Sequence, residues 1–510
     1  MKHEKLYDAL EEIQLRHIAE AANYKKKSPV RWVSAIAAIL AVAILVGTVF
    51  RSVVRPPEIE YHADATADSN PPDPVRPIRP NIPQVFIPPE GQPSPYQQLA
   101  CFVAGAEYPI MAANPGMSKD GDYDAWRNDQ MALHTQPDGY ADSLKNFWAR
   151  LDQSLLSTKG NMTCSPVNIY MALSMLAEIT DGQSRQQILD VLGADNIEQL
   201  RQQAMQVWQG HYNNDQISIS ILANSLWLQE NYGFNMETAQ LLAENYYASV
   251  FQGDLGSQEM NDMLKAWLNQ ETGGLLEDYI KDIEIDSQTV LALASTLYYQ
   301  VQWVDEFAEK NNTESIFHGA NGDTVEEFMN KALNYGPYYW GEHFGAVALG
   351  LEDGSRMWLF LPDEGFSPAQ IIDEVHAFLQ TNPSHSDSAD LNKKFMKVNL
   401  SVPKFDVSAE LDLQDIFKEM GITDIFNETK ADFTPILPKN DGGAISEVRH
   451  AARVTRDEKG VTAAAFTLIP RAGGAPMPED EIDFVLDRPF LFVVESSDGL
   501  PLFTGTVAEP

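Results

Sequence analysis

The sequence predicts an α+β domain that is preceded by a membrane-spanning helix and a proline-rich linker. Three observations predict this organisation. A long stretch without charge lies near the N-terminus, prolines are crowded just after it, and the rest of the chain carries helix patterns early and strand patterns throughout. Because these patterns do not alternate regularly, the chain lacks the signature of a parallel α/β sheet. The 510 residues suffice for one large core together with these attachments.

The composition excludes whole classes of function. A formal net charge of -37 argues against a nucleic-acid partner, because phosphate binding needs a basic surface. The two cysteines, Cys101 and Cys164, are too few for a disulfide framework or a metal-ligand cluster. We expect two free, partly buried thiols, with one bridge between them as the alternative. We expect neither a metal nor a cofactor.

The first part of the chain predicts a membrane anchor. Residues 32–50 carry no charge, and nineteen helical residues at ~1.5 Å each nearly span a ~30 Å hydrocarbon core. Basic residues are denser before this stretch than after it, so segment 1–31 should stay in the cytoplasm and the rest of the chain outside. They are Lys25, Lys26, Lys27 and Arg31 before it, and Arg51 and Arg55 after it. A cleaved signal peptide is the alternative, although its apolar region would be unusually long.

Residues 51–95 form the predicted linker. Its prolines stand at positions 56, 57, 71, 72, 74, 77, 80, 83, 88, 89, 93 and 95. Such a density removes backbone donors and favours extended polyproline geometry, so no core can form there. We interpret the linker as a spacer that lifts the next domain off the membrane, an SH3-type ligand being the alternative. Residues 96–138 are mixed in character and are interpreted as an N-terminal extension that packs on the domain.

Residues 139–510 predict one globular domain that opens with helices. Phe147, Leu151 and Leu155 recur every four residues, which predicts a helix packed by one face over 142–156. The pair Ser165-Pro166 precedes an apolar periodic run, which predicts a second helix with proline in its first turn.

A stretch near the C-terminus, residues 457–467, suits two conformations. Its alanines favour a helix, whereas its valine, threonines and phenylalanine prefer a strand. As a strand, it would carry small side chains on one face and the bulky one on the other. The two faces are Val461, Ala463, Ala465 and Thr467, and Thr462, Ala464 and Phe466. We interpret the stretch as a conformational switch, with an ordinary alanine-rich helix or loop as the alternative.

This stretch resembles the reactive-loop hinge of the serpins, which are protease inhibitors whose hinge reads Glu-x-Gly-Thr-x-Ala-Ala-x-x-Thr. The residues in register are Glu458, Gly460, Ala463, Ala464 and Thr467. Val461 replaces the usual threonine or serine but is also small and compatible with a strand. Together with Ala465, these residues make the predicted hinge.

The resemblance continues in serpin order through residues 139–510. It is carried by segments 161–173, 180–193, 223–228, 266–272, 291–307, 355–362, 402–405, 420–433, 487–492 and 502–510. Within 291–307 the Lys-Gly pair of the family is missing, so we expect a different turn there. The resemblance implies the serpin fold, with three β-sheets, surrounding helices and an exposed reactive-centre loop at one pole.

The resemblance also implies a suicide inhibitor of serine proteases, whose loop is cut and then inserts into the central sheet. Counting along the usual loop length from Glu458 puts the scissile bond at Gly474-Ala475, where small residues suit an elastase-like or subtilisin-like enzyme. Counting back from Phe484 permits a bond at Ala475 or Pro476. A cut at Arg471 would suit a trypsin-like enzyme but would shorten the inserted strand.

The sequence argues against an enzyme, since Gly-x-Ser-x-Gly, His-Glu-x-x-His, Walker and dinucleotide motifs are missing. Ser165, Asn168 and His450 are residue types that a hydrolase site could use, but we do not expect them to form one. Ser and Asn at a helix start usually cap it. By resemblance the three residues belong to the serpin shutter, a polar network beneath the main sheet that can hold it closed.

We therefore expect a monomeric, outward-facing serpin, a bacterial type of surface protein, anchored in the cell membrane by one span. Its expected partner is a serine protease, held as a covalent acyl complex. A non-inhibitory serpin acting as a binding module is the second hypothesis, favoured by Val461, Phe466 and Pro470, which depart from the commonest loop. A hydrolase that uses Ser165 or His450 is the third.

Overall fold

The computed structural model describes most of residues 95–510. The gaps are 106–107, 110, 112–121, 138, 157–159, 215–217, 275, 282, 288, 384–390, 440–442, 446–447, 459 and 462–479. Segment 1–31, the predicted span 32–50 and nearly all of the linker therefore lie outside the described residues. Within the described ranges, no helix is both long and apolar enough to cross a membrane.

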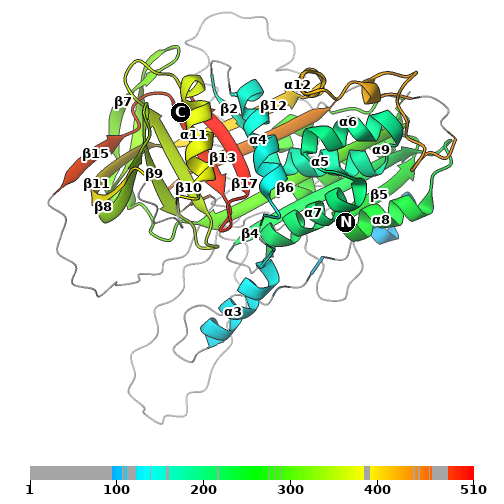
Figure 1. Ribbon diagram of the computed structural model, residues 1–510, viewed down its shortest axis with the longest axis horizontal. Coiled ribbons are helices and arrows are strands. Elements are labelled where there is room, and N and C mark those ends of the chain that lie inside the picture. Colours follow the sequence, from blue (N-terminus) through cyan, green and yellow to red (C-terminus); the bar gives the residue numbers. More distant parts are fainter. Residues whose placement is uncertain are drawn as a thin grey trace, which may run out of the picture. The chain divides into compact units, whose positions relative to one another are not determined.

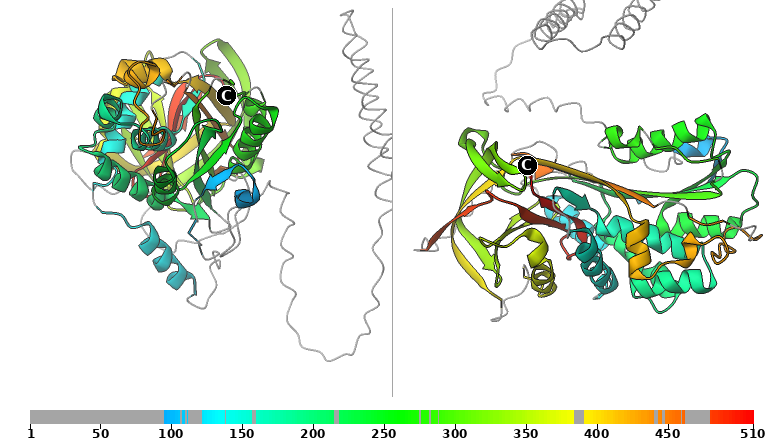
Figure 2. Two further views of the ribbon diagram at one scale, coloured as in Figure 1. Left: turned by 90° about the vertical axis from the view of Figure 1, so that its right-hand side faces the viewer. Right: turned by 90° about the horizontal axis from the view of Figure 1, so that it is seen from above.

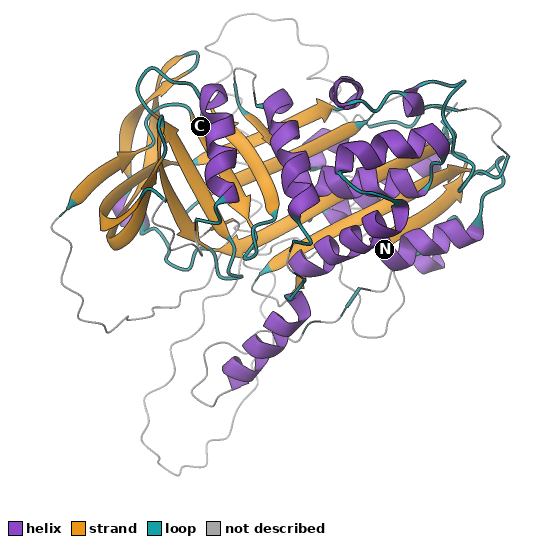
Figure 3. Ribbon diagram, in the orientation of Figure 1, coloured by secondary structure: helices purple, strands orange, loops and turns teal. Residues whose placement is uncertain are grey.

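Ten helices are described, and several begin at side chains that cap them (Figures 1 and 3). They are α3 Asp122–His134, α4 Asp142–Leu155, α5 Pro166–Glu178, α6 Gly182–Leu192, α7 Ile197–His211, α8 Met236–Tyr246, α9 Gln258–Glu271, α10 Glu277–Ile280, α11 Pro368–Gln380 and α12 Gln414–Met420. Short 3-10 turns are η1 Pro95–Gln98, η2 Glu309–Asn311 and η3 Asp424–Phe426. Ser165, Asn196 and Ser257 each accept a hydrogen bond from a backbone N–H of the first turn, a typical N-cap.

The first sheet has the order β1-β5-β4-β6-β14, with β3 on β4. Its strands are β1 Phe102–Ala104, β3 Asn213–Asn214, β4 Ile219–Gln229, β5 Ala248–Gly253, β6 Leu291–Gln302 and β14 Gly460–Val461. Strand β4 is buried on both faces because helices cover both sides of the sheet (Figure 2, right). Ala223 and Trp227 face α9, whereas Leu222 and Leu226 belong to the main core with α5.

The second sheet has the order β15-β11-β8-β9-β10-β16-β17-β2, with β7 on β8. Its strands are β2 Met162–Cys164, β7 Thr313–Gly319, β8 Gly322–Trp340, β9 Phe344–Gly350, β10 Arg356–Pro362, β11 Lys393–Pro403, β15 Glu481–Val485, β16 Phe490–Glu495 and β17 Pro501–Val507. The third sheet pairs β12 Phe405–Asp412 with β13 Arg449–Arg456. Three sheets with surrounding helices are what the sequence led us to expect.

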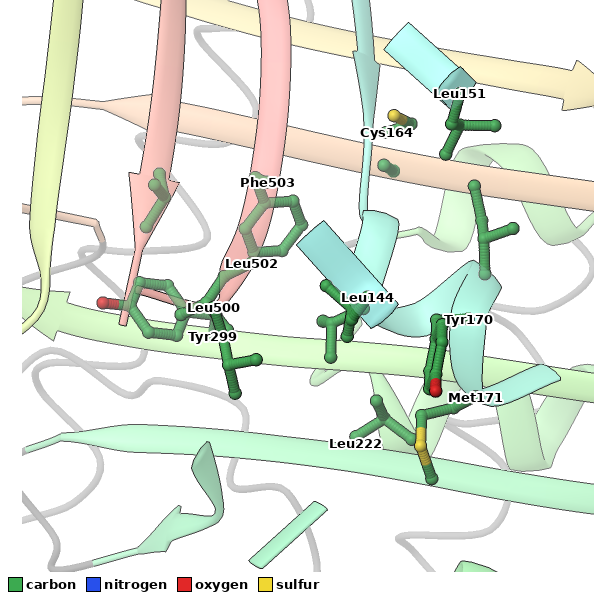
Figure 4. Close-up of a cluster of buried hydrophobic side chains, with 14 of the residues drawn as sticks. Leu144, Leu151, Cys164, Tyr170, Met171, Leu222, Tyr299, Leu500, Leu502 and Phe503 are labelled. Carbon is green, nitrogen blue, oxygen red and sulfur yellow. The ribbon is translucent and has the colours of Figure 1, made fainter. Parts of the chain in front are cut away.

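Helix α5 lies in the middle of the core, and nearly all of its residues are buried. Figure 4 shows Tyr170 and Met171 of α5 among side chains from both large sheets, including Leu222 of β4 and Leu502 of β17. The start of α5 at Ser165-Pro166 and the helix over Asp142–Leu155 confirm the helix predictions. Within the segment 291–307, strand β6 ends at Gln302.

The N-terminal extension is joined to the first sheet. Strand β1 pairs antiparallel with β5, so it occupies the outer edge of that sheet. The Tyr96 hydroxyl donates to Glu271 Oε1 of α9 at 2.7 Å, and the Tyr108 ring stacks on Tyr212 and Tyr247. These contacts join the described part of residues 96–138 to the first sheet and to α9. Cys101 and Cys164 are free thiols, as expected.

Candidate functional site

The hinge begins as a strand at the end of β6. After β13 the chain turns at Asp457 and Glu458, and β14 pairs antiparallel with β6, placing Gly460 opposite Gln302 and Val461 opposite Val301. Gly460 and Val461 therefore adopt the strand conformation that was considered for this stretch. The remaining hinge residues and the expected scissile bond lie outside the described residues: Ala463, Ala464, Ala465, Thr467, Gly474 and Ala475.

Strand β6 has one paired edge and one nearly unpaired edge. Along Leu291–Gln300 it pairs with β4, but on the other side the described residues supply only the two pairs with β14. The Thr296 hydroxyl of β6 is buried and has no hydrogen-bond partner among the described residues. Ala451 of β13 packs on the same cluster beneath α9 as Ala292 and Ala294 of β6. Strand β13 therefore lies beyond the unpaired edge, and β14 marks the start of a strand position beside β6.

Glu458 fastens the hinge at this end of the sheet. Its carboxylate pairs with Lys404 at 2.7 Å and accepts a hydrogen bond from Asn312. Lys404 also pairs with Glu327 at 2.9 Å. Burial alone would raise the pKa of Glu458, but the hydrogen bonds from Lys404 and Asn312 hold that pKa below its ordinary value. The carboxylate is thus charged at neutral pH and ties the hinge to two other segments.

The backbone carbonyls of Asp457 and Glu458 also accept hydrogen bonds. The Trp303 indole N–H donates to the Asp457 carbonyl at 3.1 Å, and the Phe307 N–H donates to the Glu458 carbonyl at 2.9 Å. Asn312 and Glu327 were not predicted from the sequence, and Lys404 and Trp303 were predicted only as part of motifs. A lysine within the apolar run Val402–Phe405 was the one available signal.

Ser165, Asn168 and His450 meet beneath the sheet, all three of them buried. The Ser165 backbone N–H donates to His450 Nε2 at 3.1 Å, and the Asn168 N–H donates to Ser165 Oγ at 3.4 Å. Burial lowers the pKa of His450 to about 4, so its ring is neutral and can accept the Ser165 amide. The Ser165 hydroxyl caps α5 instead of bonding the imidazole, which is not the arrangement of an activated nucleophile.

The comparisons with known proteins decide the family. A family profile described as "Serpin (serine protease inhibitor)" matches residues 142–510, well over half of the chain. The chain belongs to the serpin family. Serpins are protease inhibitors and not enzymes, which agrees with the geometry at Ser165.

Relatives of this serpin come from distant organisms. Serpin-ZX of Arabidopsis thaliana is 29% identical over 374 residues, covering 70% of this chain and 93% of its own. A serpin-like protein of Methanosarcina acetivorans is 29% identical over 366 residues, covering 69% of this chain and 81% of its own. Among solved structures, the thermophilic serpin tengpin in its native state superposes with a TM-score of 0.65 at 26% identity, covering 74% of this chain and 95% of tengpin. AtSerpin1 of Arabidopsis in its native stressed conformation superposes with a TM-score of 0.63 at 25% identity, covering 74% of this chain and 100% of AtSerpin1.

Proposed function

We propose that this serpin traps serine proteases by cleavage of its loop at Gly474-Ala475 and insertion of the cut loop beside β6. The protease serine attacks the Gly474 carbonyl, and the peptide that begins at Ala475 leaves with a new amino terminus. Gly474 is then held as an acyl ester on the enzyme. The observation that carries this proposal is the strand position beside β6, which β14 enters at Gly460 and Val461.

The register of β14 supports insertion of the whole hinge. The first pairs are Gly460 with Gln302 and Val461 with Val301. In an antiparallel continuation each step forward in the loop is a step back in β6, so Ala463 would meet Tyr299 and Ala465 would meet Leu297. The register would reach Leu291, the first residue of β6, at Arg471. A cut after Gly474 leaves enough chain to fill this edge, and residues 460–469 contain neither proline nor charge.

The residues around the bond support an elastase-like or subtilisin-like target. Gly474 and Ala475 are small, so they fit a shallow specificity pocket that would exclude a large side chain. Bonds after Ala475 and Pro476 are neighbouring candidates. A trypsin-like cut after Arg471 would leave a strand that ends level with the start of β6, and we expect cleavage without trapping.

We further propose that the domain acts outside the cell, tethered by residues 32–50 and spaced from the membrane by residues 51–95. The support is the charge-free stretch with its cluster of basic residues on the N-terminal side. Protease treatment of intact cells tests this topology. Digestion of the domain in intact cells is expected, and protection until lysis would contradict it.

The inhibitory function is tested with the full-length protein in a mild detergent, mixed separately with pancreatic elastase, subtilisin and trypsin. We expect a band at the summed mass that survives denaturation with elastase or subtilisin, and a released peptide whose N-terminus is Ala475. Clean cleavage by every enzyme without a complex would contradict inhibition. That outcome would favour the non-inhibitory binding module, which the departures at Val461, Phe466 and Pro470 support.

A further inference from the structure

An exposed aromatic patch lies on the second sheet, on strands β8 and β11. Tyr335 of β8 and Phe395 of β11 are 57% and 44% exposed. Their rings stack at a centroid distance of 5.1 Å and an angle of 19°. The Lys393 ammonium lies 5.4 Å from the centroid of the Phe395 ring. We call Tyr335, Phe395 and Lys393 the aromatic patch.

The charge of the patch differs from that of the whole chain. The chain carries a formal net charge of -37, yet no carboxylate in the described part pairs with Lys393. The neighbouring lysines are paired, Lys394 with Asp480 and Lys397 with Glu481. Aromatic side chains are enriched in protein interfaces, where they supply contact area at little entropic cost. A partner with apolar and acidic groups would complement this surface.

The reactive loop returns to the fold beside this patch. The Asp480 carboxylate pairs with Lys394 at 2.8 Å, and the Lys397 N–H donates to the Asp480 carbonyl at 3.0 Å. Strand β15 then runs parallel to β11 from the pair Glu481 with Lys397. The last residue of the loop is thus bound to residues on both sides of Phe395.

Chain length keeps a protease on the loop close to the patch. Gly474 and Asp480 are six residues apart in the sequence, which an extended chain covers in about 20 Å at most. A protease of roughly 220 residues has a radius of gyration of about 17 Å. The whole enzyme is therefore wider than this span. An enzyme engaged at Gly474-Ala475 must therefore lie within reach of β11.

We propose that the aromatic patch is a second contact for the target protease, on the enzyme's surface beside its substrate cleft. This inference rests on the proposed function and deepens it, because the patch selects among proteases that can cut the same bond. Tyr335 and Phe395 provide the apolar contact, and Lys393 pairs with a carboxylate of the enzyme. The patch acts on encounter and docking and has no part in the chemistry of the bond.

The test compares association rates of full-length variants with each protease that the unchanged protein traps. The double variant Tyr335→Ser/Phe395→Ser is expected to associate at least about tenfold more slowly with the preferred enzyme. Its inhibition stoichiometry and the released peptide should be unchanged. Val325→Ser is the matched control, since Val325 is 68% exposed at the other end of β8. It should leave the rate unchanged.

A charge reversal separates recognition from a general disturbance of the sheet. Lys393→Glu keeps both rings, and it is expected to slow association most at low salt and least at high salt. Equal association rates for the double variant and the unchanged protein, with every enzyme trapped, would contradict the proposed second contact and leave the proposed function intact. A slower rate with Val325→Ser as well, or a lowered thermal stability that accounts for the loss, would also overturn the second contact. Failure of the unchanged protein to trap any protease would overturn the proposed function and this inference together.

Discussion

The two edges of strand β6 are built in opposite ways. On one edge, β4 pairs with it from Leu228 opposite Leu291 to Ile219 opposite Gln300, and β5 and β1 extend the sheet outward. On the other edge, the described residues supply only Gly460 and Val461 of β14. Beyond that edge, β13 makes its own ladder with β12 along its full length. One edge is completed by the fold, whereas on the other edge the described residues begin a strand position and do not fill it.

This difference teaches where the molecule can change. An unpaired strand edge leaves backbone groups without partners and is a template for another strand. A sheet that is complete on one side and incomplete on the other can gain a strand without loss of its existing ladders. Two of the site residues lie close to this edge: Glu458 at its end, and His450 beneath it.

The largest expected effect comes from blocking the incomplete edge. Ala463→Arg should convert the inhibitor into a substrate, because insertion would bury an unpaired charge at a cost of several kcal/mol. The rate of insertion would then fall by more than about tenfold, so that hydrolysis of the acyl enzyme would be faster than insertion. Ala463→Ser is the matched control, since it changes the same position and keeps the side chain small and uncharged. Densitometry of complex and cleaved product measures the ratio, and equal trapping by both variants would refute the proposed insertion.

The next effect concerns His450 beneath the sheet. Its folded pKa of about 4 lies below its ordinary value of 6.5, so the unfolded chain binds more protons between these values. The free energy of unfolding should therefore fall as pH drops from 6.5 toward 4, by up to about 3 kcal/mol. Urea titrations at pH 7 and pH 5 measure this fall. His450→Gln should make this fall smaller, whereas His318→Gln, at an exposed site, should not. An unchanged fall in His450→Gln would contradict the buried neutral ring.

A smaller effect is expected at the hinge anchor. Glu458→Gln removes the charge that faces Lys404, and should lower the free energy of unfolding at pH 7 by about 1–2 kcal/mol. The contribution is full above the ordinary glutamate pKa of 4.5 and is lost as pH falls through the lower folded pKa, so the variant and the parent should converge well below pH 4.5.

The control for Glu458 is the exposed pair of Lys397 with Glu481 at the other end of the loop. Glu481→Gln should lower the free energy of unfolding by less than Glu458→Gln does, because exposed ion pairs contribute little. Equal costs at the two sites would show that Glu458 is not a special anchor.

The smallest effect is expected on the completed side of the sheet. Burial raises the pKa of Glu271 to about 7, and the Tyr96 hydroxyl is the group that favours its charged form. Tyr96→Phe should lower the free energy of unfolding by about 1 kcal/mol, mainly above pH 7 where the carboxylate is charged. Denaturant titrations at pH 8 and pH 5 measure it, and an equal loss at both values would contradict this account. The variant should leave the trapping ratio unchanged.

Much of this architecture could be predicted from the sequence, because it rests on local patterns. Ser165-Pro166 marks the start of α5 by capping chemistry, and small residues after Gly460 are compatible with the strand that β14 begins. The three-residue strand β1 could not be predicted, because it is too short to show a period. Nor could the anchor at the hinge, since Asn312, Lys404 and Glu458 come from three distant segments and meet only when the sheets are assembled.

The most direct test of the central claim is amide hydrogen exchange on β6 and β13 before and after the loop is cut by the protease that the protein traps. If the cut loop becomes a strand between them, the peptides covering residues 291–302 and 449–456 should become more protected, and those covering β4 should stay as they were. Unchanged exchange on both β6 and β13 after cleavage would mean that the loop stays outside the sheet, and the account of the incomplete edge would be wrong.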